Sequence, residues 1–424
     1  MLNELQGGMK VESEGPLNEE LENFSCFSFL QLTTEEKIDP ACLDISIAGE
    51  EAGTLENPNI DLILQHSTLS SYGKGERTVM DTTYRNGLEI PAESFKWVGK
   101  SYDPVDYHFN GKIAAAMFLG RKVKLELYKI AIYKAGGHFD WHMDTTHDDD
   151  HQATLLLALN TTWEGGDLVL RVNGVETHVD MRPKPTVSEE VYKGTAVQAV
   201  VFYTDTEHKV EPVSNGVRIV LQYDVKVMEG ELDEVKSFSD SVLEHVEKLH
   251  NLRDREGLSV AVPSAGVVQD IVDIVEELLE EEEEEEVAFA LQHLYRKSSI
   301  VREYLKGGDA LVYEALVDSG LFDVSLHPVL LHEKTDYEGS FQGTEWTFAC
   351  RSDDMPVKNE EETEKKRKRQ TPPIFYVNDA SAIKLLTQKN YIESTGNEVQ
   401  FGVNKYFGGG IFVRKRSVRR NLEA

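Results

Sequence analysis

The chain has 424 residues, of which 40% are hydrophobic and 28% are charged, as in a globular protein with room for about two or three domains. Its formal net charge of −31 repels phosphate backbones and anionic membrane surfaces, so neither nucleic acid nor a membrane is expected as a partner. The three cysteines have no C-x-x-C spacing, and no apolar run approaches the roughly 20 residues that cross a bilayer. We therefore expect a cytoplasmic or nuclear protein.

The first half of the chain predicts a flexible tail followed by a β-rich domain. Residues 1–23 are polar and acidic, which is typical of a solvated tail. Residues 24–228 predict the first domain, with β-prone segments and one helix at Phe109–Leu119. Within it, residues 122–226 contain about seven short β-elements separated by turn signals such as Asn173-Gly174. This spacing indicates a β-barrel or a jelly roll.

Residues 229–424 predict a C-terminal region that combines helices with strands. Helical periodicity predicts helices at Val235–Leu252, Val267–Leu279, Ala288–Tyr295, Ile300–Leu305 and Ala310–Val317. β-prone sequence follows at Phe322–Leu331, Glu345–Cys350 and Tyr406–Arg416. The fold class of the whole chain is therefore expected to be mixed α/β.

Two charged runs lie in this C-terminal region. Glu280–Glu286 is a run of seven glutamates, which predicts a solvated helical segment. Residues 351–371 predict a polar linker that contains the basic run Lys365–Arg369. This run is similar to a nuclear import signal, although short basic runs are also common in solvated linkers.

The most informative stretch is a predicted strand that ends in two overlapping His-x-Asp motifs. After Gly136-Gly137 come His138-Phe-Asp140 and His142-Met-Asp144. Because side chains two residues apart share a face of an extended segment, parity puts all four acceptors on one face. Two histidines and one carboxylate form the facial triad of non-haem Fe(II) oxygenases, so either motif could supply two ligands.

The third ligand is expected from a neighbouring strand that is distant in sequence. His208 and His178 are the candidates. Ten residues after His208, Arg218 enters an apolar strand, where a guanidinium is costly unless an anion pairs with it. A guanidinium can bind a dicarboxylate by two parallel hydrogen bonds, which Ser188, ten residues after His178, cannot do. His208 is therefore the expected third ligand, with Arg218 as the anchor for a dicarboxylate.

Residues 122–226 resemble the prolyl 4-hydroxylase-like branch of the 2-oxoglutarate/Fe(II) dioxygenases. The resemblance rests on Tyr133-x-x-Gly136-Gly137 before His142-x-Asp144, on Gly165-Gly166 at the next strand, and on His208 followed by Arg218. It implies an oxygenase domain with a double-stranded β-helix core. It also selects the second His-x-Asp motif, which leaves His138 and Asp140 as neighbours of the site.

The resemblance further implies cofactors and roles for five residues. It implies Fe(II) held by His142, Asp144 and His208, and 2-oxoglutarate held by Arg218 with a hydrogen bond from Tyr133. The implied reaction uses O2 to hydroxylate a prolyl or other side chain of a protein or peptide, releases succinate and CO2, and has ascorbate as a candidate reductant. The alternative is a catalytically inactive metal-binding β-helix that serves as a scaffold or interaction protein.

Several residues beside the motif carry two interpretations. Asp148–Asp150, flanked by His147 and His151, are expected to form a solvated loop at the mouth of the site, with a second metal site as the alternative. Trp141 and Trp163 could shape a substrate entrance or pack in the core.

Overall fold

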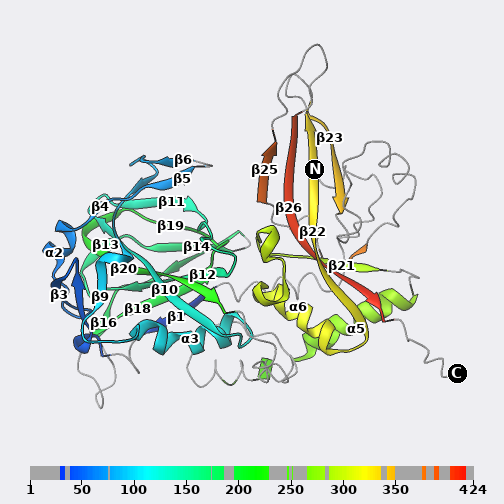
Figure 1. Cartoon of the computed structure of the whole chain (residues 1–424), viewed down its shortest axis with the longest axis horizontal. Helices are drawn as coiled ribbons and strands as arrows, with labels where there is room; N and C mark the ends of the chain where they lie inside the picture. Colours follow the sequence, from blue (N-terminus) through cyan, green and yellow to red (C-terminus); the bar gives the residue numbers. More distant parts are fainter. Residues whose placement is uncertain are drawn as a thin grey trace, which may run out of the picture. The chain divides into compact units, whose positions relative to one another are not determined.

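The structure is a computed structural model, and it divides into two compact units, which are described separately below (Figure 1). Unit 2 comprises residues 25–236 and 249–262, and unit 1 comprises residues 1–24, 237–248 and 263–424. The structure describes residues 29–33, 39–74, 77–172, 174–185, 195–228, 246–247, 251, 265–281, 286–335, 341–348, 375–378, 386–390 and 402–416. The predicted tail 1–23, most of the predicted helix Val235–Leu252, and the linker 351–371 with its basic run lie outside these residues.

Unit 2 is built on two antiparallel β-sheets (Figure 1). The larger sheet has the order β1 (Phe29–Thr33), β18 (Gln198–Tyr203), β12 (His151–Ala158), β20 (Val213–Val227), β10 (Val123–Lys134), β8 (Leu88–Pro91) and β4 (Thr68–Leu69), with β13 (Trp163–Gly165) also paired to β20. The smaller sheet has the order β15 (Val175–Val179), β14 (Leu168–Val172), β19 (Glu207–Val210), β11 (His138–His142) and β7 (Arg85–Asn86). This is the jelly-roll core that the turn spacing predicted for residues 122–226.

The hydrophobic core of unit 2 lies between these two sheets. Its members include alternate residues of the larger sheet, such as Ala131 and Tyr133 of β10 and Val220 of β20. From the smaller sheet it includes Leu168 and Val210. Because successive side chains of a strand point to opposite faces, this alternation fixes which residues of each strand face the partner sheet.

The other face of the larger sheet contacts the helix α3 (Pro104–Met117). The Tyr203 hydroxyl donates a hydrogen bond to the Met117 carbonyl at 2.5 Å, and the rings of Phe118 and Tyr203 lie edge to face. The helix predicted at Phe109–Leu119 is confirmed but begins earlier. Its N-cap, Asp103, accepts hydrogen bonds from the backbone N–H groups of Val105 and Asp106 and so stabilises the first turn.

Smaller elements complete unit 2. They are the three-stranded sheet β3 (Glu50–Thr54), β2 (Asp44–Ile47) and β9 (Phe95–Trp97), the helix α2 (Ile60–Gln65), and the two-stranded pairs β5 (Tyr72–Lys74) with β6 (Arg77–Val79) and β16 (Lys184–Pro185) with β17 (Thr195–Ala196).

The described residues of unit 1 form one sheet and two helices. The sheet has the order β23 (Phe341–Phe348), β22 (Phe322–Thr335), β26 (Gly402–Lys415), β21 (Val287–Ala290) and β24 (Phe375–Tyr376), with β25 (Leu386–Asn390) also paired to β26. The helices are α5 (Ala265–Glu281) and α6 (Gly307–Asp318), which confirm the predictions at Val267–Leu279 and Ala310–Val317.

Two helix predictions in unit 1 are wrong. The segment expected as the helix Ala288–Tyr295 begins as strand β21, whose four residues are all buried between β26 and β24. A short apolar run is compatible with a buried strand as well as a helix, and only pairing with neighbours decides. The predicted helix Ile300–Leu305 contains only a 3-10 turn at Arg302–Tyr304.

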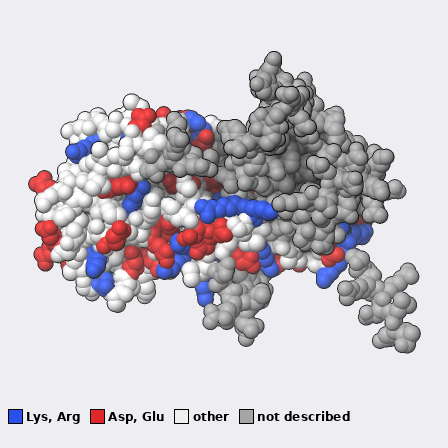
Figure 2. All heavy atoms as spheres, turned by 45° about the horizontal axis from the view of Figure 1, so that its top comes forward, with Lys and Arg blue, Asp and Glu red and all other residues white. Residues whose placement is uncertain are grey.

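The two ends of the glutamate run contact basic side chains of β26. Glu280 pairs with Lys415 at 2.6 Å and Glu286 with Arg414 at 2.7 Å, and residues 282–285 between them lie outside the described part. On the face that Figure 2 shows, acidic and basic side chains are interspersed among the coloured residues. No helix in the described part of the chain is both long and apolar enough to span a membrane.

Two glycines, Gly216 within β20 and Gly174 in the turn between β14 and β15, offer a matched test of packing in unit 2. Gly216 and Gly174 both have a positive φ, +79° and +77°. A Cβ at Gly216 would collide with the carbonyl oxygen of Thr162, whereas a Cβ at Gly174 would meet nothing within 4 Å. We expect Gly174→Ala to cost about 1 kcal/mol of unfolding free energy through φ strain alone, and Gly216→Ala on the order of 3 kcal/mol or more. Urea unfolding of both variants measures this difference, and equal losses would contradict it.

Candidate metal centre

Two cross-strand pairs form the site. In the register of β11 with β19, His142 lies opposite His208. In the register of β10 with β20, Tyr133 lies opposite Arg218. Directly opposed residues have Cβ atoms about 4.5–5.5 Å apart, so strand pairing brings each pair into contact although more than 60 residues separate its members. Asp144 lies just beyond the end of β11, where its backbone N–H donates to the Thr204 carbonyl at 3.0 Å.

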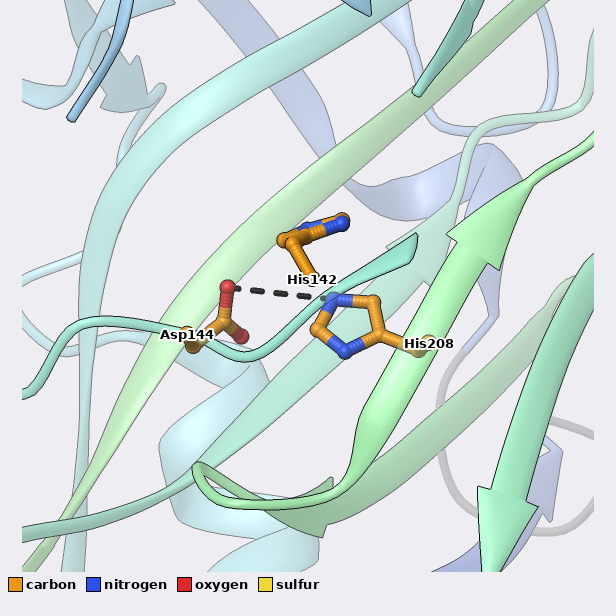
Figure 3. Close-up of side chains that lie close together, drawn as sticks. All are labelled: His142, Asp144 and His208. Atoms are coloured by element: carbon orange, nitrogen blue, oxygen red, sulfur yellow. Dashed lines mark ion pairs between the residues drawn. The ribbon is translucent and has the colours of Figure 1, made fainter. Parts of the chain in front are cut away.

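The side chains of His142, Asp144 and His208 converge (Figure 3). One ligand atom from each lies within 4.8 Å of the others. His208 Nε2 is 3.8 Å from Asp144 Oδ1, and the two imidazole centroids are 4.1 Å apart. Ligands at roughly 2.0–2.2 Å from one ion lie about 3 Å apart in a facial set, so the three side chains would move slightly inward to hold a shared ion. The donor set of two imidazoles and one carboxylate suits Fe(II).

Hydrogen bonds to backbone carbonyls orient both imidazoles. His142 Nδ1 lies 2.8 Å from the Asp140 carbonyl, and His208 Nδ1 lies 2.9 Å from the Thr206 carbonyl. Only a protonated Nδ1 can donate to a carbonyl, so the lone pair of a neutral ring is at Nε2. This arrangement leaves the lone pair of each Nε2 atom available to bind a metal ion.

The protonation states also suit metal binding. Burial, together with the neighbouring His208, lowers the pKa of His142 to about 3, so that this ring is neutral at pH 7. Burial alone would raise the pKa of the Asp144 carboxyl, but His208, His142 and the hydroxyl of Thr154 together hold that pKa below its ordinary value. Thr154 donates to Asp144 Oδ2 at 2.6 Å, which leaves Oδ1 on the side of His208.

The first His-x-Asp motif does not join this cluster. The two ring nitrogens of His138 lie 3.1 Å from the carbonyl oxygens of Gly136 and Thr83, and Asp140 is exposed. The prediction that parity puts all four acceptors on one face is wrong, because the register of β11 with β19 shifts between Phe139 and His142. After this irregularity the Phe139 ring stacks on His142 at 3.5 Å.

Arg218 is a buried cation without a carboxylate partner in the described part of the chain. It is 1% exposed, its Nη1 has no hydrogen-bond partner among the described residues, and its Nη2 lies 3.3 Å from Met181 Sδ. The guanidinium lies 5.6 Å from the centroid of the Tyr133 ring. Burial lowers the pKa of Arg218 to about 10, which leaves it cationic at neutral pH. An unpaired buried cation is unfavourable, so this geometry fits an anionic ligand.

A cavity of about 390 Å³ connects Arg218 with the three converging side chains. Its apolar lining comes from both sheets, namely Ala131, Leu156, Leu168, Val210 and Val220. Such a lining with a few convergent polar groups is typical of a small-molecule site.

The remaining predicted residues lie elsewhere. His178 is exposed and forms a separate group with Asp167 and Glu211. Trp163 is buried in the core, and Trp141 is covered by the guanidinium of Arg171 at 3.7 Å.

The histidines beside the Asp148–Asp150 loop form a cluster with a different aspartate. His147 Nδ1 lies 2.6 Å from Asp224, whereas Asp148 pairs with Lys226. His151 accepts a hydrogen bond from the His147 backbone N–H at Nδ1, and its Nε2 lies 3.1 Å from the Ala153 carbonyl. Both nitrogens of His151 thus have hydrogen-bond partners. Ligand atoms of His147, His151 and Asp224 also lie within 4.8 Å of one another, so the alternative of a second metal site at these histidines stays a prediction.

Three contributors to this site were not predicted from the sequence. Thr154 carries the one hydroxyl of β12 and precedes four apolar residues, a signal that could have identified it. Phe139 and Met181 carry no comparable signal, since buried aromatic and thioether side chains are common in cores.

The comparisons with known proteins agree with this geometry. Residues 128–223 match the family model of the 2OG-Fe(II) oxygenase superfamily. The match implies Fe(II) and 2-oxoglutarate as cofactors for residues 128–223, where His142, Asp144 and His208 are the candidate metal ligands. No curated protein matches the chain.

Similar solved structures include three oxygenases. A prolyl-4-hydroxylase of Pseudomonas putida is 22% identical over 35% of this chain and 75% of its own, with a TM-score of 0.24. A prolyl hydroxylase of Trichoplax adhaerens, solved with a hypoxia inducible factor peptide, is 15% identical over 53% and 96%, with a TM-score of 0.26. A 2OG-Fe(II) oxygenase family protein of Burkholderia pseudomallei is 14% identical over 40% and 78%, with a TM-score of 0.25.

The protonation state of His142 can be measured directly. In the metal-free protein we expect its ring to stay neutral between pH 5 and pH 8, because its pKa is about 3. Histidine-selective nitrogen-15 NMR should show an imidazole signal with constant chemical shifts over this range, assigned by its loss in His142→Gln. A signal that titrates near pH 6.5 would contradict the burial argument.

Proposed function

We propose that this chain, whose residues 128–223 match the 2OG-Fe(II) oxygenase superfamily, is an Fe(II)- and 2-oxoglutarate-dependent dioxygenase. Its substrate is proposed to be a side chain of a protein or peptide, with a prolyl side chain as the first candidate. Turnover would release succinate and CO2.

One observation supports the proposal: two imidazoles and a carboxylate line the same cavity as a buried arginine that has no carboxylate partner among the described residues. In this proposal His142, Asp144 and His208 hold the iron. Both imidazoles have Nδ1 fixed by a backbone carbonyl, and Asp144 has Oδ2 fixed by Thr154, so each side chain has one atom left for the metal. The side chains therefore need little reorganisation to bind an ion.

Arg218 is the proposed anchor for the distal carboxylate of 2-oxoglutarate. A carboxylate would supply the hydrogen-bond partner that Nη1 lacks and the charge that the buried guanidinium needs. Tyr133, directly opposite on β10, is proposed to donate a supporting hydrogen bond. A dicarboxylic keto acid fits a cavity with a cation at one end and metal ligands at the other.

The bound cofactors supply the oxidation, in which O2 and 2-oxoglutarate are consumed and a substrate C–H bond becomes C–OH. The residues of this chain supply position and environment. Apolar side chains of both sheets line the cavity beside the metal ligands and give it surface of low polarity there. The stacked Phe139 ring limits the rotation of His142.

Replacing His142 tests the metal centre. We expect His142→Ala to abolish Fe(II)- and 2-oxoglutarate-dependent succinate formation and to weaken iron binding, because one of three ligands is lost. His178→Ala, an exposed histidine in the same unit, is the matched control. Unchanged turnover in His142→Ala would refute the proposal. An iron-loaded native chain that consumes no 2-oxoglutarate would instead favour the non-catalytic scaffold.

Replacing Arg218 tests the co-substrate anchor. We expect Arg218→Gln to raise the KM for 2-oxoglutarate by about 10- to 100-fold, since a hydrogen bond to a charged group contributes about 1.5–3 kcal/mol. Steady-state kinetics at saturating iron measures this, with Arg171→Gln, a partly exposed arginine paired with Glu176, as the control. An unchanged KM would show that another group binds the distal carboxylate.

A further inference from the structure

The cavity has a second cationic region that the proposed cofactors do not use. Arg85 and Lys129 both line it, together with the carboxylate of Glu89. Arg85 Nη2 and Lys129 Nζ contact the same oxygen of Glu89, at 3.5 and 3.2 Å. Two cations therefore share one carboxylate, and one positive charge is left over.

Arg85 is held rigidly beside the metal ligands. It is 6% exposed, and its Nη1 donates to the Ser71 carbonyl at 2.5 Å. Its guanidinium lies 4.5 Å from the centre of the Phe139 ring, which also stacks on His142 and meets the Tyr84 ring edge to face. Its Nε has no hydrogen-bond partner among the described residues, and the contact of Nη2 with Glu89 is at the long limit of a hydrogen bond. Glu89 thus leaves the guanidinium incompletely paired.

Lys129 adds to the excess of positive charge. Its side chain is 12% exposed and lies on β10, four residues before Tyr133. Burial lowers the pKa of Lys129, and the charge of Arg85 lowers it further, while Glu89 opposes both effects. The cationic form is therefore under repulsion that an additional anion would relieve.

The proposed cofactors would not neutralise this region. When both imidazoles are neutral, an Fe(II) ion, Asp144 and Arg218 together carry two net positive charges. The two negative charges of a 2-oxoglutarate dianion cancel them. The charge at Arg85 and Lys129 then persists in a partly buried space, where charge interactions are stronger than in water. A bound substrate is the remaining molecule that could balance it.

We propose that the substrate carries a carboxylate that binds at Arg85 and Lys129, on the same side of the cavity as Tyr84 and Tyr128, while the carbon to be oxidised lies at the metal centre. This inference rests on the proposed dioxygenase function and narrows its substrate class. The carboxylate has two sources, the acidic side chain of a peptide or the α-carboxylate of a free amino acid. The two tyrosines provide apolar surface for the remainder of the substrate.

The test uses the full iron-loaded chain with 2-oxoglutarate and two sets of probes. The first is a pool of acetylated, amidated peptides with randomised sequence, in which mass spectrometry identifies the peptides that gain one oxygen. The second compares free amino acids with their amides as stimulators of 2-oxoglutarate consumption. We expect Asp and Glu to be enriched about fivefold or more in the oxidised peptides. Alternatively, free amino acids should stimulate 2-oxoglutarate consumption more than their amides do, by a similar factor.

Variants then assign the preference to the two cations. Arg85→Gln should abolish the preference for carboxylates, and Arg85→Glu should shift oxidised peptides towards Lys and Arg. Lys129→Gln is a second variant, whose amide can still donate a hydrogen bond to Glu89. It tests the preference if the Arg85 variants fail to fold because Arg85 is needed for packing. Lys124→Gln, an exposed lysine on the same strand, is the matched control.

The outcomes separate the two proposals. If the native chain consumes no 2-oxoglutarate with or without probes, the dioxygenase function fails and this inference fails with it. If 2-oxoglutarate is consumed but no carboxylate-bearing probe is preferred, or if the preference survives in Arg85→Gln and Lys129→Gln, the inference alone is overturned.

Discussion

The register of two antiparallel strand pairs is the constraint on which the site depends. Pairing of β11 with β19 puts His142 opposite His208, and pairing of β10 with β20 puts Tyr133 opposite Arg218. A slip of one residue in either pair would move a functional side chain to the opposite face of its sheet. The core prevents such a slip, because alternate residues of β10 and β20 are buried between the sheets. The interactions that stabilise the fold are thus the same ones that align the proposed catalytic groups.

Burial makes this cavity chemically different from the rest of the protein. The chain carries a net charge of −31, yet three of its cations, Arg85, Lys129 and Arg218, line one cavity with little exposure. Charges on the exterior are screened by solvent, whereas those in the cavity are not. The local excess of positive charge therefore governs which molecules can bind, and it favours acids in a strongly acidic protein.

The immediate surroundings of the metal ligands restrict their orientation. Two backbone carbonyls bind the Nδ1 atoms of His142 and His208, and Thr154 binds one oxygen of Asp144. A phenyl ring and a guanidinium are stacked in succession on the outer side of His142. These groups lower the cost of organising the site, because each ligand is already held when an ion arrives.

The sequence by itself identified His142, Asp144, His208 and Arg218 as the candidate residues of the site. The His-x-Asp motif, and an arginine ten residues after a second histidine, are local patterns that can be recognised without knowledge of the fold. The turn spacing predicted the sheet-rich core.

Only the tertiary structure decided the rest. Parity could not choose between the two His-x-Asp motifs, because the irregularity after Phe139 changes which side chains share a face. Arg85 and Lys129 line the cavity from β7 and β10, and Thr154 reaches Asp144 from β12, so only the pairing of these strands brings the three side chains to the site. The strand at Val287–Ala290 likewise depends on partners more than 80 residues away. The physical reason is common to all three cases: local patterns specify which side chains are available, whereas strand pairing and burial specify which of them meet.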